Sequence, residues 1–260
     1  MLKILKYSFY DLMRSRWSYV YFLFYLLLGV VLLFLNNDLN KAVITLMNVI
    51  IMLVPLIGTI FGVMYYYNSR EFTELLLAQP IKRSSIFLGQ YLGVATSLMM
   101  SLVVGLGIPF VFYGVFYSDA IWDFILLLIA GAFLTFIFTA LAFVIGLSNE
   151  NRIKGFGYAI LVWLFLAVIY DGIFLMSLIY FEDYPLDTFS LGAVLLNPVD
   201  LSRVLILLKL DISALLGYTG AVFHKFFGTN MGLILSFVML TVWVAVPAFF
   251  IWRISKRKDF

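Results

Sequence analysis

Residues 68–91 read NSREFTELLLAQPIKRSSIFLGQY and form a polar island between two long apolar stretches. Charge enters with Arg70, Glu71 and Glu74, and three leucines follow before Pro80. Proline lacks an amide hydrogen and disfavours helical backbone in the residue before it, so a helix begun near Arg70 should end here. The island therefore predicts a short helix held in water between two membrane spans.

The turn after Pro80 is basic, because Lys82 and Arg83 follow it. Ser84 or Ser85 is expected to accept from the free amide groups at the start of the next helix. A short helix, a proline, a basic turn and a capped membrane helix together predict a rigid elbow.

The composition places the chain in the membrane class. Hydrophobic residues make up 64% of its 260 residues and charged residues only 12%, whereas soluble domains carry roughly 25% charged residues. The chain has no cysteine and a single histidine, His224, which argues against disulfides, thiolate metal sites and sites that need two histidines. We therefore expect an all-α integral membrane protein without a metal site of its own.

Six apolar stretches have the roughly 20 residues that a helix needs to cross the bilayer. They are Trp17–Leu35, Val43–Tyr67, Tyr91–Tyr117, Ile121–Leu147, Gly155–Phe181 and Met231–Trp252. Residues 1–16 place basic and apolar side chains on opposite sides of a helix, which favours an interfacial helix or, alternatively, a merely basic tail. Residues 68–90 then form a loop between the second and third spans of a single transmembrane domain.

The orientation follows from the basic residues. With both termini in the cytoplasm, thirteen of the seventeen Lys and Arg residues face inward, as the positive-inside rule favours. These thirteen are Lys3, Lys6, Arg14, Arg16, Arg70, Lys82, Arg83, Arg152, Lys154, Arg253, Lys256, Arg257 and Lys258. We expect a multi-pass protein of the cell's inner membrane whose elbow lies on the cytoplasmic side.

Residues 182–230 are too apolar for a solvated loop, so residues 191–228 are interpreted as external helices that lie on the membrane or dip into it. Asn197 is expected to cap a helix with Pro198 in its first position and Asp200 in its first turn. Arg203 follows on the same helix, and Gly217 and Gly220 punctuate the apolar piece after it.

Asp171 is the acidic residue deep in a predicted span. An ionisable group is costly there, which makes Asp171 a functional candidate. Three interpretations stay open: Asp171 lines a polar pathway, pairs across a subunit interface, or sits near a water-filled mouth.

The stretch ELLLAQPIKRSSIFLGQYLG, from Glu74 in the elbow to Gly93, resembles the cytosolic loop of ABC-2 type transporter permeases. The resemblance implies a permease fold with helical external segments between spans five and six, and a homodimer that carries two copies of a cytosolic ATPase. It also implies that Arg70, Glu71, Glu74, Pro80, Lys82 and Arg83 couple the permease to that ATPase. One departure is Gln90, where relatives often have Lys.

The stretch from Leu195 to Gly228 is similar to the NosY-type branch of these permeases, which serves nitrous-oxide-reductase maturation. The likeness implies export of a sulfur species or ATP-coupled copper delivery to the periplasm. It also implies an external partner or gate at Asn197, Pro198, Asp200, Arg203, Gly217 and Gly220, and a periplasmic copper-loading accessory protein among the possible partners. The alternative is a generic ABC-2 exporter of a drug, lipid or polysaccharide.

The chain has no G-x-x-x-x-G-K-[ST] motif, so ATP and Mg²⁺ are expected on the partner ATPase and no cofactor or catalytic residue on this chain. Partners are then that ATPase, a second copy of the chain and membrane lipid, and no nucleic acid. Two other classes remain as alternatives, an intramembrane hydrolase that uses His224 and a scaffold without transport.

Overall fold

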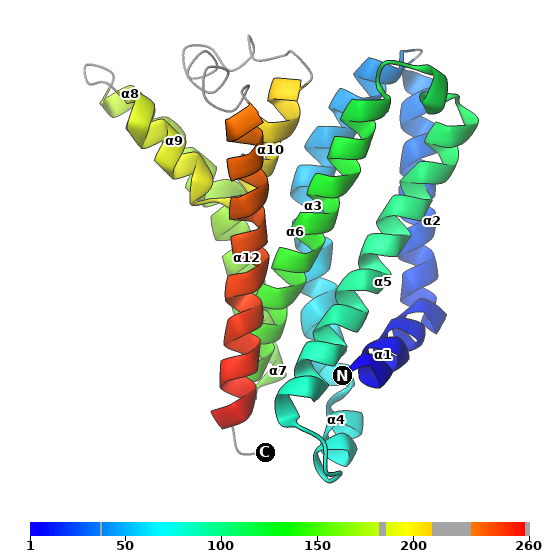
Figure 1. Cartoon of the computed structure of the whole chain (residues 1–260), viewed down its shortest axis with the longest axis vertical. Coiled ribbons are helices and arrows are strands. Elements are labelled where there is room, and N and C mark those ends of the chain that lie inside the picture. Colours follow the sequence, from blue (N-terminus) through cyan, green and yellow to red (C-terminus); the bar gives the residue numbers. More distant parts are fainter. Residues whose placement is uncertain (37, 182–185, 210–229, 258–260) are drawn as a thin grey trace.

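The described part of the chain, residues 1–36, 38–181, 186–209 and 230–257 of a computed structural model, consists of helices joined by short turns and contains no strand (Figure 1). The helices are α1 (Leu2–Arg14), α2 (Arg16–Leu35), α3 (Leu39–Asn68), α4 (Arg70–Leu77), α5 (Arg83–Phe112), η1 (Val115–Tyr117), α6 (Ile121–Ser148), α7 (Arg152–Leu164), η2 (Phe165–Ile169), α8 (Tyr170–Tyr180), α9 (Asp187–Leu195), α10 (Pro198–Lys209) and α12 (Asn230–Arg257).

Six helical segments in this described part are long and apolar enough to cross a membrane, which confirms the predicted fold class. They are α2, α3, α5, α6, the continuous segment Arg152–Tyr180 and α12 from Met231. The third span, α5, begins at Arg83 and thus extends before the predicted start at Tyr91. The apolar span continues directly into the elbow as one helix.

The centre of the bundle is the packing of α3 against α6. A Cβ added at Gly62 would lie 2.7 Å from the Cβ of Ala142, so no larger residue fits at this crossing. Gly58 precedes Gly62 by one helical turn and meets Thr139 and Phe138 of α6. Lipid supplies no hydrophobic force between membrane helices, so they associate through close packing, and small residues permit that packing.

Helix α1 packs on the start of α5 through another small-residue contact (Figure 1). A Cβ at Gly93 would lie 2.7 Å from both the Leu5 carbonyl oxygen and the Ser8 Cβ. Ile4, Ser8 and Leu12 are the buried residues of α1, and its basic residues Lys3, Lys6 and Arg14 are exposed. The amphipathic pattern thus orients α1 against the base of α5.

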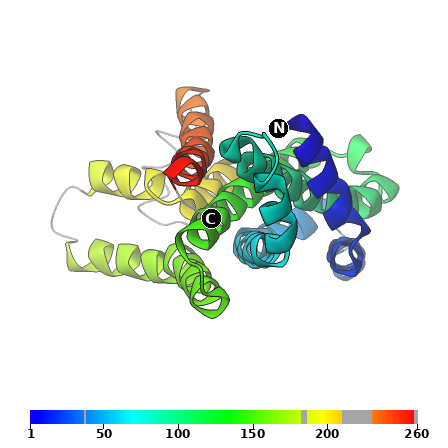
Figure 2. The ribbon, with the colours of Figure 1, turned by 90° about the horizontal axis from the view of Figure 1, so that it is seen from below.

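The fifth span is interrupted by the π-helical turn η2, where the chain continues from α7 into α8. The next helix, α9, runs back beside α8, and α10 turns away from α9 by 111° (Figure 2). This bent pair, α9 and α10, is not among the six spans. This pair, called the hairpin below, lies between the fifth and sixth spans in the chain, and its external placement stays a prediction.

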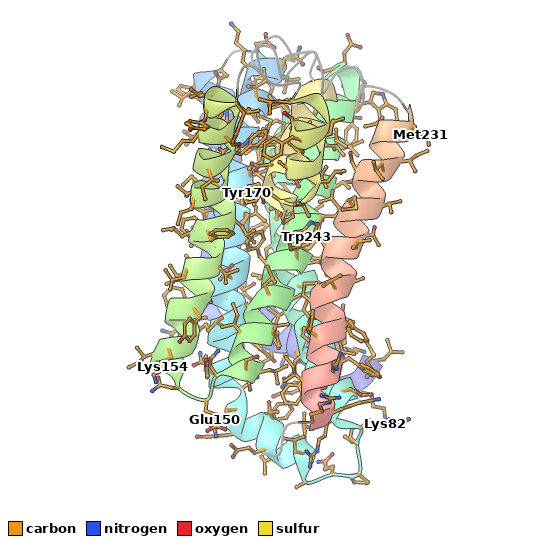
Figure 3. All side chains as sticks on the ribbon, turned by 90° about the vertical axis from the view of Figure 1, so that its left-hand side faces the viewer. Lys82, Glu150, Lys154, Tyr170, Met231 and Trp243 are labelled. Atoms are coloured by element: carbon orange, nitrogen blue, oxygen red, sulfur yellow. The ribbon has the colours of Figure 1, made fainter. Side chains whose placement is uncertain are left out.

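Both described chain ends lie at the end of the bundle that carries α4 (Figure 1). Lys82, Glu150 and Lys154 lie at that end, and Met231 lies at the other (Figure 3). The predicted positions Gly217, Gly220 and His224 lie outside the described residues.

Candidate functional site

The elbow, residues 70–83, projects from the end of the bundle as α4 and the turn that follows it (Figure 1). The six residues assigned to coupling are all exposed: Arg70, Glu71, Glu74, Pro80, Lys82 and Arg83. Arg70 Nε donates to Glu74 Oε1 at 3.1 Å, and both side chains are more than half exposed. Leu75 is also 68% exposed, so α4 presents a mixed face of charge and leucine.

The other face of α4 is attached to the bundle at two points. Thr73 is buried, and the Nε2 of buried Gln90 on α5 donates to its Oγ1 at 2.8 Å. The Phe72 ring stacks on the Tyr7 ring of α1, with centroids 4.5 Å apart. Gln90, the departure from the family pattern, is thus the residue that links α5 to α4.

The turn at Pro80 confirms the predicted end of α4 but not the predicted cap of α5. Helix α4 ends at Leu77, before the proline. Helix α5 begins at Arg83 with Lys82 as its N-cap and no side-chain cap hydrogen bond. Ser84 and Ser85 lie inside its first turn rather than at its cap position, so the predicted serine cap is wrong.

Only Ser69 separates α3 from α4. The Ser69 amide donates to the Tyr65 carbonyl at 2.9 Å, and the Thr73 amide donates to the Ser69 carbonyl at 2.9 Å, so the hydrogen-bond ladder continues across the junction. Tyr67 near the end of α3 donates through its hydroxyl to the Asn149 carbonyl at 2.8 Å, in the turn between α6 and α7. Helix α4 is thus joined by hydrogen bonds to both α3 and α5.

A second group of polar residues lies between α8 and α10, and we call Asp171, Asn197, Asp200 and Arg203 the Asp171 cluster. Arg203 Nη1 lies 2.8 Å from Asp171 Oδ2 and 3.2 Å from Asp200 Oδ1. The side chains of Arg203 and Asp171 are 29% and 31% exposed, whereas that of Asp200 is only 6% exposed. One cation thus bridges two carboxylates from two helices.

Asn197 joins the cluster to the π-turn. Its Oδ1 accepts from the Val199 amide at 3.0 Å, which confirms the predicted cap of α10. Its Nδ2 donates to Asp200 Oδ2 at 2.7 Å and to the Leu166 carbonyl at 2.8 Å. Leu166 lies in η2, so this second bond ties Asn197 to the π-turn. A π-turn changes the ordinary pattern of backbone hydrogen bonds, and such turns often occur at functional sites.

The electrostatics of the cluster are set by burial. Burial raises the pKa of Asp200 to about 6, the Arg203 guanidinium opposes the shift, and the neighbouring Asp171 adds to it. A buried charge is tolerated when it is paired and hydrogen-bonded, and Asp200 has both kinds of partner. The geometry suits a structural or gating contact between α8 and α10.

The structure brings together four of the sequence-predicted residues, Asp171, Asn197, Asp200 and Arg203, and it gives Asp171 a partner within its own chain. Sequence reasoning missed two further anchors of the hairpin. The Tyr170 hydroxyl donates to the Ala193 carbonyl at 2.7 Å, and Trp243 Nε1 of α12 donates to the Leu195 carbonyl at 3.3 Å. Tyr170 adjoins Asp171, but no pattern in the sequence marks Trp243.

Comparison with known proteins gives two matches. A family model described as ABC-2 family transporter protein matches residues 4–213. The chain is also similar to a protein of Stutzerimonas stutzeri described as "Probable ABC transporter permease protein NosY", with 23% identity over 266 residues that cover 95% of each chain. The range matched by the family model includes both the elbow and the Asp171 cluster.

Proposed function

The chain belongs to the ABC-2 family of transporter proteins, and on that premise we propose that its elbow is the docking surface for a separate cytosolic ATPase. The chain is the permease subunit, the transport component of an ABC transporter. The observation that carries the proposal is the exposed charged face of α4 on a helix whose other face is attached to both α1 and α5.

The attachment of α4 explains why this face would suit a mechanical role. A loop that only connects two spans in water would need no contact with the helices behind it. Here Thr73 and Phe72 fix α4 to two neighbouring helices. Since α3 ends and α5 begins at the elbow, closure of the ATPase would tilt the second and third spans. That motion would alter the opposite face of the bundle, around Pro198 and the residues that follow it.

The assembly that we propose is a homodimer of this chain with two copies of the ATPase, which bind the ATP and Mg²⁺. The chain would lie in the cell's inner membrane with both termini in the cytoplasm. Twelve of the thirteen inward-assigned basic residues are in the described part, and the labelled Lys82 and Lys154 lie at the elbow end of the bundle (Figure 3). The Asp171 cluster would serve as part of the pathway or its external gate.

At the finer level we propose a role in nitrous-oxide-reductase maturation, either export of a sulfur species or ATP-coupled copper delivery through a periplasmic accessory protein. Its support is the full-length likeness to the NosY relative and the similar stretch after Asn197. Cells that lack the chain should produce nitrous oxide reductase without its copper centre. A fully copper-loaded enzyme from such cells would contradict this role and favour a generic ABC-2 exporter.

The docking proposal is tested by charge reversal. In membranes that also contain the cognate ATPase, Glu71→Lys with Glu74→Lys should lower co-purification of the ATPase and its coupled ATP hydrolysis by at least about tenfold, because two contacts of opposite sign become repulsive. The matched control is Asp119→Lys, also exposed but placed between α5 and α6 at the other end of the bundle. Unchanged hydrolysis in the Glu71/Glu74 variant would contradict the proposal.

A further inference from the structure

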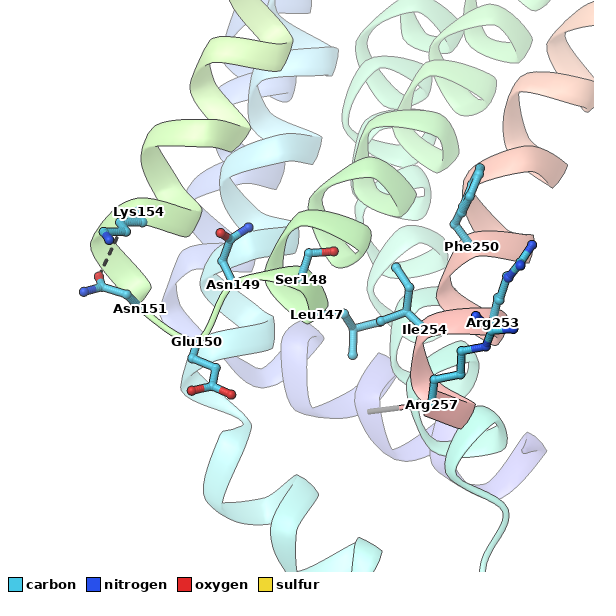
Figure 4. A pocket seen from close by; sticks show the side chains of 10 residues that line it. All are labelled: Leu147, Ser148, Asn149, Glu150, Asn151, Lys154, Phe250, Arg253, Ile254 and Arg257. Carbon is cyan, nitrogen blue, oxygen red and sulfur yellow. Dashed lines mark hydrogen bonds between the residues drawn. The ribbon is translucent and has the colours of Figure 1, made fainter. Parts of the chain in front are cut away.

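A groove opens at the elbow end of the bundle between the start of α7 and the end of α12 (Figure 4). Its volume is roughly 820 Å³, and the turn between α6 and α7 forms part of its wall. Three cationic side chains, Lys154, Arg253 and Arg257, and one carboxylate, Glu150, line it. The lining therefore carries a net positive charge, although the family assignment gives these residues no role.

The α12 wall alternates apolar and cationic side chains and ends on a cation at Arg257. Phe250, Arg253, Ile254 and Arg257 are spaced as one helix face, and all four line the groove. At 1.5 Å per residue, Arg257 lies roughly 10 Å further along the helix axis than Phe250. The two cations of this face therefore adjoin apolar side chains, with Arg257 nearest the end of α12.

The three cations that line the groove are available to a ligand. Within the described part of the chain, the structure records no ion pair for Lys154, Arg253 or Arg257. Lys256, in contrast, is directed elsewhere and lies 3.8 Å above the Trp252 ring. On the opposite wall, Asn151 accepts from the amides of Ile153 and Lys154 and so fixes the first turn of α7.

We infer that this groove binds the phosphate headgroup of an anionic phospholipid of the adjacent leaflet, with an acyl chain against Phe250 and Ile254. Basic pockets between membrane helices at the inner face are suited to anionic headgroups. A lipid fits better than a soluble anion because the cations adjoin an apolar surface. The groove opens outward from the single chain, whose fifth and sixth spans bury only 11% and 22% of their most apolar segments inside it.

The test compares lipid binding to the purified full-length chain by native mass spectrometry, with phosphatidylglycerol and phosphatidylcholine as probes. The chain should retain phosphatidylglycerol in preference to phosphatidylcholine. Each cation near an anionic group contributes about a fivefold gain in affinity, so Arg253→Gln with Arg257→Gln should lose roughly 25-fold for phosphatidylglycerol only. Arg253→Lys with Arg257→Lys should retain binding, because lysine keeps the charge.

The matched control removes two exposed cations from the elbow at the same end of the bundle, Arg70→Gln with Lys82→Gln, and should change the affinity less than about twofold. Three results would overturn the inference. They are equal retention of both lipids by the native chain, displacement of phosphatidylglycerol by millimolar inorganic phosphate, and an unchanged affinity for phosphatidylglycerol in Arg253→Gln with Arg257→Gln. The inference does not depend on what the transporter carries.

Discussion

The elbow and the Asp171 cluster both hold an arginine beside acidic residues, but they place it in different surroundings. The Arg70–Glu74 pair connects two residues of one helix, with side chains 61% and 57% exposed. Arg203 connects two helices and bridges to Asp200, which is nearly buried. An arginine–carboxylate pair thus lies in water at the elbow and among packed helices in the Asp171 cluster.

This difference determines what each pair can do. An exposed pair adds little stability because water screens it, which leaves its charges free to meet a partner. A buried pair is costly to break because removal of one member leaves the other without a counterion. We therefore expect the elbow to tolerate mutation structurally and fail functionally, and the Asp171 cluster to fail structurally first.

Arg203→Ala should have the largest effect. The change leaves Asp200 and Asp171 facing one another without a cation, and it should lower the free energy of unfolding by about 3 kcal/mol. Thermal unfolding in detergent measures this loss. Arg70→Ala is the matched control and should cost less than about 0.5 kcal/mol; equal losses for the two variants would contradict the comparison.

Asn197→Ala should have the next largest effect, about 2 kcal/mol. It removes the cap of α10 and leaves the Leu166 carbonyl without its amide donor. Asn48→Ala, at an exposed position of α3, provides the baseline in the same unfolding measurement. If both variants unfold alike, Asn197 does not hold α10 to the π-turn.

The stability of the protein should also depend on pH through Asp200. Its pKa in the folded chain is about 6, above the ordinary value of 3.8. A raised carboxyl pKa gives stability that is complete below the unfolded pKa and is lost as pH rises through the folded pKa. Stability should therefore fall by roughly 1 kcal/mol between pH 5 and pH 7. The same measurement on Asp200→Asn should show no such fall of stability with pH. An unchanged fall in that variant would show that another group causes it.

Gln90→Met should have the smallest effect on stability, less than about 1 kcal/mol, because it replaces one hydrogen bond by an apolar chain of similar length. It should nevertheless uncouple ATP hydrolysis, since α4 loses its attachment to α5 at Thr73. The exposed Gln79→Met is the control. Full coupling in the Gln90 variant would show that the stacking of Phe72 on Tyr7 is sufficient.

Much of the fold could be predicted because its signals are local. Apolar length predicted the six spans, and the Asn197–Pro198 pair predicted the start of α10. The π-turn η2 was not predicted, because no local pattern in residues 165–169 marks it, and the hydrogen bond from Asn197 to its Leu166 carbonyl comes from 31 residues away. The serine cap of α5 was wrong because the helix simply begins earlier, at Arg83.

The sequence indicated which polar residues belong to the sites, but it did not indicate which of them form bonds with one another. Asp171 was singled out as an ionisable residue in a span, whereas its bond to Arg203 crosses 32 positions and depends on the packing of α8 and α10. Gln90 was recognised only as a departure from the family pattern. Its role as the anchor of Thr73 required the fold.

Docking of a cytosolic ATPase requires the elbow on the cytoplasmic side of the membrane, and cysteine labelling measures this directly. Because the chain has no cysteine, Leu75→Cys and Met231→Cys give single reporters that are 68% and 81% exposed before substitution and lie at opposite ends of the bundle. In intact cells, a membrane-impermeant maleimide should label position 231 and leave position 75 unlabelled until the inner face is exposed. Labelling of position 75 in intact cells would contradict the account, because no cytosolic ATPase could then reach α4.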